Sequence, residues 1–110
     1  MLSKKDIISI NQALDSGTIV NESSLDFAVE MTRKSKNWLK TVALLVRAVL
    51  IDHVFADGNK RTSSAIIMAY LDMNGFDYDP DVVNKTVIKI LTKNVTDVGK
   101  IEQLIKNVIE

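Results

Sequence analysis

The 110-residue sequence predicts a single all-α domain, a bundle of about six helices that spans residues 1–110. Apolar residues recur at spacings of three and four along most of the chain, which is the pattern of helices with one buried face. Glycine and proline are scarce, and Gly17, Gly75 and Pro80 fall between the periodic runs. Only residues 18–20, which are all β-branched, suggest a strand.

The first two predicted helices follow serine caps. Ser3 and Asp6 together resemble a capping box, and the helix that they open is expected to end near Gly17. Ser23 or Ser24 is expected to cap the second helix. The apolar face of each helix has helical spacing: Ile7, Ile8, Ile10 and Leu14 in the first, and Leu25, Ala28, Val29 and Met31 in the second.

The third and fourth predicted helices are the most apolar of the chain. The third runs from about Trp38 to about Asp52, and the fourth from about Asn59 to Asn74, where Gly75 ends it. A helix that is apolar nearly all round is normally buried. We therefore expect these two helices at the centre of the bundle.

Two more helices complete the prediction. Asp79 and Pro80 are an N-cap and a first-turn proline for a fifth helix, which extends through about Lys93. Thr96 and Asp97 are expected to cap the last helix.

Composition excludes several functions. The chain has 14 basic and 14 acidic side chains, and a formal charge of zero argues against a protein that coats nucleic acid. With no cysteine and a single histidine, it forms neither a disulfide nor the usual zinc sites. The N-terminus lacks the apolar core of a secretory signal, and no run approaches the roughly 20 apolar residues of a membrane-spanning helix. We expect a cytoplasmic protein with no nucleic-acid or membrane partner.

Residues 53–62, His-Val-Phe-Ala-Asp-Gly-Asn-Lys-Arg-Thr, place polar and charged groups between the two most apolar helices. Gly58 allows the backbone to approach a ligand closely. Asn59, Lys60 and Arg61 then open a helix, whose free N–H groups and dipole favour an anion. The two cationic side chains add charges suited to phosphate.

Two further residues complete the parts of a phosphoryl- or nucleotidyl-transfer site. Asp57 adjoins the anion site, where a Mg²⁺ ion between its carboxylate and the phosphates would balance the charges. Alternatively, Asp57 is only the N-cap of the next helix. His53 ends the preceding helix and can act as a general base toward a hydroxyl group.

The segment from His53 to Arg61 resembles the signature of the Fic/Doc family, H-x-F-x-[DE]-G-N-[GK]-R. Residues 21–28 and 74–76 are also similar to segments of this family, and Val54 departs from its common proline. The family is all-α and carries its signature between two central helices. The same arrangement is therefore expected here.

Two positions favour the Doc (death-on-curing) branch of the family. Fic enzymes usually read G-N-G-R-x-x-R, whereas this chain has Lys60 at the second glycine and Ser64 at the second arginine. In Doc-like proteins, this lysine accompanies an ATP that presents its γ-phosphate to the target hydroxyl. The resemblance thus implies an ATP-dependent protein kinase that acts on a Ser/Thr hydroxyl.

The resemblance also implies a role for each matching residue. His53 would be the catalytic base, Asp57 the Mg²⁺ ligand and Phe55 the anchor of the loop in the core. The residues that bind the ATP phosphates would be Gly58, Asn59, Lys60 and Arg61. A flap that pairs with the target peptide through main-chain hydrogen bonds would consist of Thr18, Ile19 and Val20.

Membership of this branch would make the protein the toxin of a toxin–antitoxin pair. The implied cofactors are ATP and Mg²⁺, and the implied partners are a translation elongation factor as substrate and a cognate antitoxin. Two alternatives remain open: a Fic-type AMP transferase on the same scaffold, and a non-catalytic helical interaction domain.

Overall fold

The computed structural model describes residues 1–110 and confirms the all-α fold, with six α-helices, one π-helix and no β-sheet. In chain order the helices are α1 (Lys4–Leu14), α2 (Glu22–Lys34), α3 (Trp38–Val46), η1 (Arg47–Ile51), α4 (Asn59–Met73), α5 (Pro80–Thr92) and α6 (Val98–Lys106). No helix combines the length and the apolar character needed to cross a membrane.

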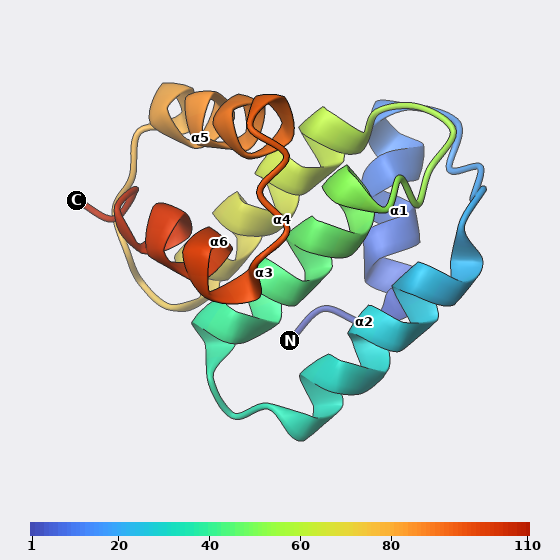
Figure 1. The fold of residues 1–110 in the computed structure, drawn as a ribbon, viewed down its shortest axis with the longest axis horizontal. Helices are drawn as coiled ribbons and strands as arrows, with labels where there is room; N and C mark the ends of the chain where they lie inside the picture. Colours follow the sequence, from blue (N-terminus) through green and yellow to red (C-terminus); the bar gives the residue numbers. More distant parts are fainter.

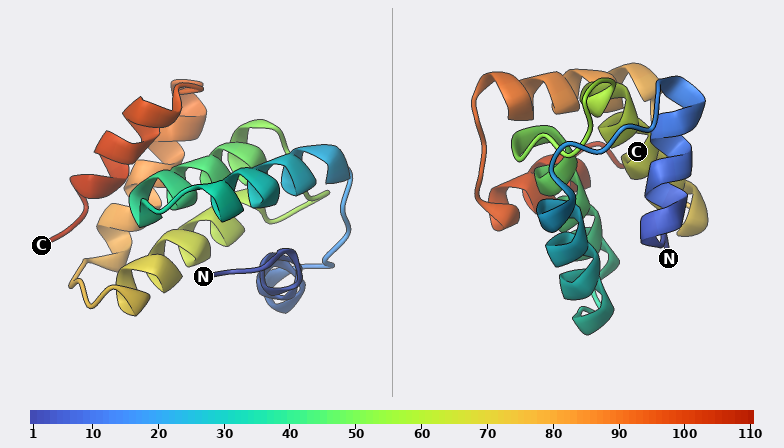
Figure 2. Two further views of the ribbon diagram at one scale, coloured as in Figure 1. Left: turned by 90° about the horizontal axis from the view of Figure 1, so that it is seen from below. Right: turned by 90° about the vertical axis from the view of Figure 1, so that its right-hand side faces the viewer.

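The two most apolar segments lie at the centre, as predicted. α3 continues into η1 as one central rod, and α4 packs beside it (Figure 1). α2 and α6 pack against α3, whereas α1 and α5 pack against α4 (Figures 1 and 2). A single core of 22 buried residues receives side chains from every helix. The loop that joins η1 to α4 is thus anchored at both ends in the most buried elements.

Most of the predicted helix boundaries agree with the structure. Ser3 and Asp6 form both hydrogen bonds of the capping box at the start of α1. Asp79 and Asp97 cap α5 and α6 through hydrogen bonds from backbone N–H groups to their carboxylates. Gly75, with a φ of +74°, follows the end of α4.

The start of α2 and the end of α1 differ from the prediction. Asn21, rather than Ser23 or Ser24, is the N-cap of α2, and its side-chain oxygen accepts a hydrogen bond from the backbone N–H of Ser24. Asn21 is favoured over the two serines because its side-chain amide also donates to the carbonyl of Asp52 at 2.7 Å. α1 ends at Leu14, which is 36% exposed and does not belong to the core.

The third predicted helix does not remain an α-helix as far as Asp52. Its last five residues, Arg47–Ile51, form the π-helix η1, and the N–H of Asp52 donates to the carbonyl of Arg47 at 3.2 Å. A π-turn accommodates one extra residue per turn, and such turns occur mostly inside α-helices and frequently at functional sites. Here only Asp52 separates the π-turn from His53.

Candidate functional site

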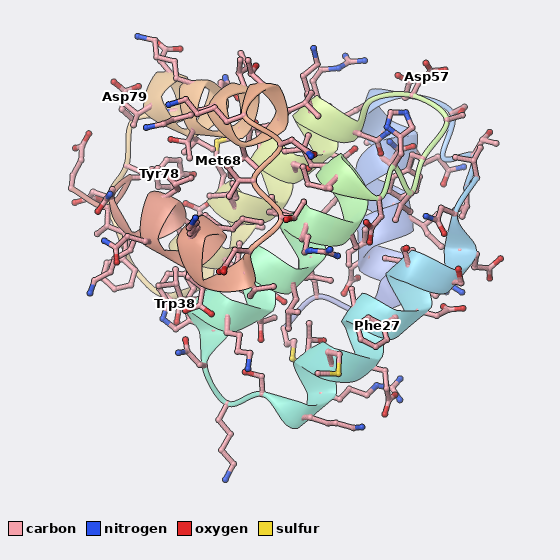
Figure 3. All side chains as sticks on the ribbon, in the orientation of Figure 1. Phe27, Trp38, Asp57, Met68, Tyr78 and Asp79 are labelled. Atoms are coloured by element: carbon pink, nitrogen blue, oxygen red, sulfur yellow. The ribbon has the colours of Figure 1, made fainter.

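The site loop, residues 52–58, connects η1 to α4 at one end of the central helices. In Figure 3, Asp57 marks this loop at the end of the molecule opposite Trp38. His53 is exposed and has a left-handed φ of +59°. Val54 and Phe55 are fully buried, and the chain returns to the surface at residues 56 and 57.

Phe55 and Asn59 hold the middle of the site loop in the core. The side-chain oxygen of Asn59 accepts a hydrogen bond from the N–H of Phe55 at 3.1 Å, and its amide nitrogen donates to the carbonyl of Phe55 at 2.8 Å. The aromatic ring has no exposed surface. Because the Asn59 side chain is occupied in this way, its backbone N–H is the group that remains for an anion.

Residues 18–20 run antiparallel to the site loop. The N–H of Ala56 donates to the carbonyl of Thr18 at 2.9 Å, and the N–H of Val20 donates to the carbonyl of Val54 at 2.8 Å. The strand-like segment of the sequence is therefore a single bridge, between Ile19 and Phe55, and not a strand. The N–H and the carbonyl of Ile19 make no hydrogen bond within the protein, so this short edge is free.

The first turn of α4 has no side-chain cap. Gly58 occupies the N-cap position with a φ of +76°, so Asp57 does not cap the helix. The backbone N–H groups of residues 58–61 donate to no acceptor in the protein. Together with the helix dipole, they form a site suited to an anion.

Five of the predicted site residues meet at one pocket, which we call the His53 pocket, whereas Arg61 does not line it. It has a volume of about 180 Å³ and is lined by Leu50, His53, Ala56, Asp57, Gly58, Asn59, Lys60 and Leu91. Asp57 is the one acidic residue among them, and its carboxylate forms no ion pair. A potential base, a carboxylate, a cation and free N–H groups thus border the same space.

A second pocket, the Ser64 pocket, lies on the other side of Lys60. It has a volume of about 280 Å³ and is lined by Lys60, Arg61, Ser64, Asn84, Val87 and Ile88. Lys60 borders both pockets, and the guanidinium of Arg61 forms an ion pair with Asp15 at 3.2 Å. Lys60 lies where the two pockets meet and Arg61 lines the Ser64 pocket alone, whereas the residues that α5 contributes to the Ser64 pocket are neutral.

The residues present are compatible with magnesium bound together with a nucleotide. No group of three or more His, Cys, Asp or Glu side chains gathers anywhere in the protein. Magnesium in nucleotide enzymes needs no such group, because one or two carboxylates and the substrate phosphates hold it. Asp57, exposed and unpaired at the His53 pocket, offers one carboxylate of this kind.

Sequence reasoning missed Asn11 as a residue that shapes the site. Its fully buried amide donates to the carbonyl of Asp57 at 2.9 Å and to the hydroxyl of Thr62 at 3.0 Å, and its oxygen accepts from the N–H of Gly17 at 2.9 Å. The signal was an asparagine four positions after Ile7, on the apolar face of α1. A polar residue at such a position must find buried partners.

Comparison of the chain with protein-family models, with curated proteins and with solved structures found no match. The functional conclusion below therefore depends on the motif and on the geometry of the two pockets.

Proposed function

We propose that the protein is a Doc-like toxin of a toxin–antitoxin pair, a protein kinase that transfers the γ-phosphate of ATP to a Ser/Thr hydroxyl. The observation that carries this proposal is the His53 pocket, where His53, Asp57 and Lys60 border the uncapped start of α4. Five residues of the motif line this pocket: His53, Asp57, Gly58, Asn59 and Lys60.

Phosphate binding is the first task of such a site. The free N–H groups of residues 58–61 would bind phosphate oxygens, and Lys60 and Arg61 would neutralise their charge. A Mg²⁺ ion held by Asp57 and the phosphates would reduce the charge that the incoming hydroxyl meets.

His53 would carry out the proton transfer. Its imidazole takes the proton of the target hydroxyl while the hydroxyl oxygen bonds to the γ-phosphorus and the bond from that phosphorus to the β,γ-bridging oxygen breaks. The products are ADP and a phosphorylated target, and the proton then leaves His53 to solvent. The exposure of His53 allows a protein hydroxyl to reach it.

The free edge at Ile19 offers a way to hold the target. An extended peptide could add to this edge through main-chain hydrogen bonds and lie beside the site loop. Residues 18–20 are thus proposed as the target flap.

The Ser64 pocket favours γ-phosphate transfer over AMP transfer. In a kinase the nucleoside of ATP lies on the side of the site away from the catalytic base His53. In an AMP transferase the β- and γ-phosphates lie on that side instead. On the side of this pocket away from Lys60 and Arg61, which would hold phosphates, there are apolar contacts and neutral hydrogen-bonding groups. They come from Ser64, Asn84, Val87 and Ile88 and suit a nucleoside better than terminal phosphates. A translation elongation factor as substrate and a cognate antitoxin come from the motif resemblance, and a cytoplasmic location completes the proposal.

Intact-protein mass spectrometry tests the reaction. The purified protein is incubated with Mg-ATP and a purified elongation factor, and the expected gain is about 80 Da for a phosphoryl group, against about 329 Da for an adenylyl group. The His53→Ala variant is expected to give no gain and no growth arrest when expressed in bacteria. Growth arrest by His53→Ala would contradict the enzyme mechanism and favour a non-catalytic interaction domain.

A further inference from the structure

His53 has a backbone conformation that requires an explanation. A φ of +59° is left-handed and costs an L-residue other than glycine roughly 1–2 kcal/mol unless its surroundings hold it. The residue directly follows the C-cap of η1, the position where a left-handed residue commonly ends a helix.

The other two left-handed helix ends of the protein show the usual support. After α4, the N–H groups of Gly75 and Phe76 donate to the carbonyls of Asp72 and Leu71 at 3.1 and 3.0 Å. After α5, the N–H groups of Asn94 and Val95 donate to the carbonyls of Leu91 and Ile90 at 3.1 and 3.0 Å. Each end therefore has both hydrogen bonds of a Schellman motif.

His53 has neither of these two bonds. The N–H groups of His53 and Val54 donate to no acceptor in the protein. The hydrogen bonds within η1 thus do not fix the conformation of His53, and the support must come from elsewhere in the chain.

Asn21 supplies that support on both sides of His53. Its side-chain amide donates to the carbonyl of Asp52 at 2.7 Å, and its backbone N–H donates to the carbonyl of Val54 at 3.1 Å. The same residue is the N-cap of α2, so a rigid helix holds it in place. One residue therefore holds the carbonyl groups of both neighbours of His53 in the chain, Asp52 and Val54.

We propose that Asn21 is a positioning residue for His53. Its hydrogen bonds to Asp52 and Val54 hold the backbone of His53 in the left-handed conformation, and that conformation keeps the imidazole at the His53 pocket. The catalytic consequence rests on the proposed function. The conformational consequence does not, since it follows from the contacts alone.

The variant Asn21→Asp separates the positioning role of Asn21 from its capping role. Aspartate caps a helix as well as asparagine does, but it has no amide donor for the carbonyl of Asp52. Asn37→Asp is the matched control, because Asn37 caps α3 in the same manner and lies outside the site. Asn21→Ser also keeps a capping oxygen, and it replaces Asn21→Asp if that variant does not fold.

The first measurement is the conformation of His53 by NMR. The chain has one histidine, so a single imidazole signal and one intraresidue amide-to-Hα contact report on it. A positive φ makes that contact strong. We expect it to weaken in Asn21→Asp and to stay strong in Asn37→Asp. Retention of the left-handed conformation in the folded Asn21 variant would overturn the proposal whatever the activity.

The second measurement is the steady-state transfer rate. Misplacement of the base is expected to lower kcat about 10- to 100-fold in Asn21→Asp, with the KM for ATP within about two-fold of wild type. A lost conformation with an unchanged kcat would overturn the positioning role. If the wild-type protein transfers nothing, yet Asn21→Asp loses the conformation, the proposed kinase function fails and the conformational role of Asn21 stands.

Discussion

Gly58 is the residue at which backbone geometry and packing restrict the site most closely. Its φ of +76° is left-handed, and a β-carbon there would lie 3.1 Å from a carboxylate oxygen of Asp15 and 3.2 Å from the amide nitrogen of Asn11. Both neighbours belong to the end of α1. A side chain at this position would therefore press the site loop away from α1.

We expect Gly58→Ala to destabilise the fold more than Gly75→Ala does. Gly75 has nearly the same φ, +74°, but its β-carbon would meet nothing within 4 Å, so it reports the backbone cost alone. The expected loss is about 1 kcal/mol for Gly75→Ala and at least about 1 kcal/mol more for Gly58→Ala. Urea denaturation followed by circular dichroism measures both. Equal losses would mean that the contact with α1 carries no cost.

Arg61 is the site cation whose positive charge is already partly neutralised by an ion pair with Asp15. Its ion pair with Asp15 is 3.2 Å long, and the guanidinium side chain is 64% exposed. Since an exposed ion pair contributes little to stability, Asp15 competes with phosphate for Arg61 without being essential to the fold.

The variant Asp15→Asn is therefore expected to bind ATP more tightly. Release of Arg61 is expected to lower the Kd for Mg-ATP by up to about five-fold, measured by isothermal titration calorimetry. Glu30→Gln is the matched control, because it breaks the exposed pair of Glu30 with Arg33 on α2. Weaker binding in Asp15→Asn would show that Asp15 orients Arg61 instead of competing for it.

At the scale of the helices, the capping residues explain which helix boundaries could be predicted from the sequence. A cap is a local signal, and Ser3, Asp79 and Asp97 act within the segment in which they were recognised. Asn21 was missed because its selection depends on the carbonyl of Asp52, which lies 31 positions along the chain. No local pattern encodes that partner.

The π-helix and the support from α1 escaped prediction for related reasons. Residues 47–51 are apolar at most positions, so their periodicity does not distinguish an α-turn from a π-turn. Asn11 lies in α1 and Asp15 is the C-cap of that helix, outside the motif, and only the folded chain brings them to Gly58. The residues of the motif itself were found because they are consecutive.

The capping box of α1 makes its stability sensitive to acid. Hydrogen bonds from the backbone N–H and then the hydroxyl of Ser3 lower the pKa of the Asp6 carboxyl from its ordinary value of 3.8. A lowered pKa in the folded state means that the carboxylate stabilises the fold above about pH 3.8, and that this contribution is lost as the pH falls through the folded-state pKa.

We therefore expect acid to weaken α1 less in Asp6→Asn than in the wild type. Amide hydrogen exchange of residues in α1, compared between neutral and acidic pH, measures the effect. The variant should exchange faster than wild type at neutral pH, with the difference shrinking in acid. An equal acid dependence in the two proteins would assign the loss to other carboxylates.

At the scale of the whole molecule, one hydrophobic core connects the candidate site to the opposite end of the protein. The 22 buried residues form a single cluster to which every helix contributes, and the radius of gyration is 12.4 Å. Such a chain is expected to unfold in one cooperative step, because no element has a separate core.

The single tryptophan and the single histidine allow a direct test of this cooperativity. Trp38 opens α3 at the end of the molecule opposite Asp57 of the site loop (Figure 3). His53 belongs to that loop and follows the C-cap of η1. Trp38 fluorescence and the imidazole NMR signal are expected to give the same urea midpoint. An earlier midpoint for the His53 signal would reveal a site that opens independently of the core.

The buried contacts of Asn11 also set the order in which a growing chain can mature on the ribosome. Two of its partners, Asp57 and Thr62, are synthesised 46 and 51 residues later. α1 can form early, and the Asn11 oxygen can then bond to Gly17, yet the amide nitrogen lacks its partners until Thr62 has been synthesised. A nascent polypeptide halted before that point has no assembled site, so the complete translation of this region is itself a requirement for any activity.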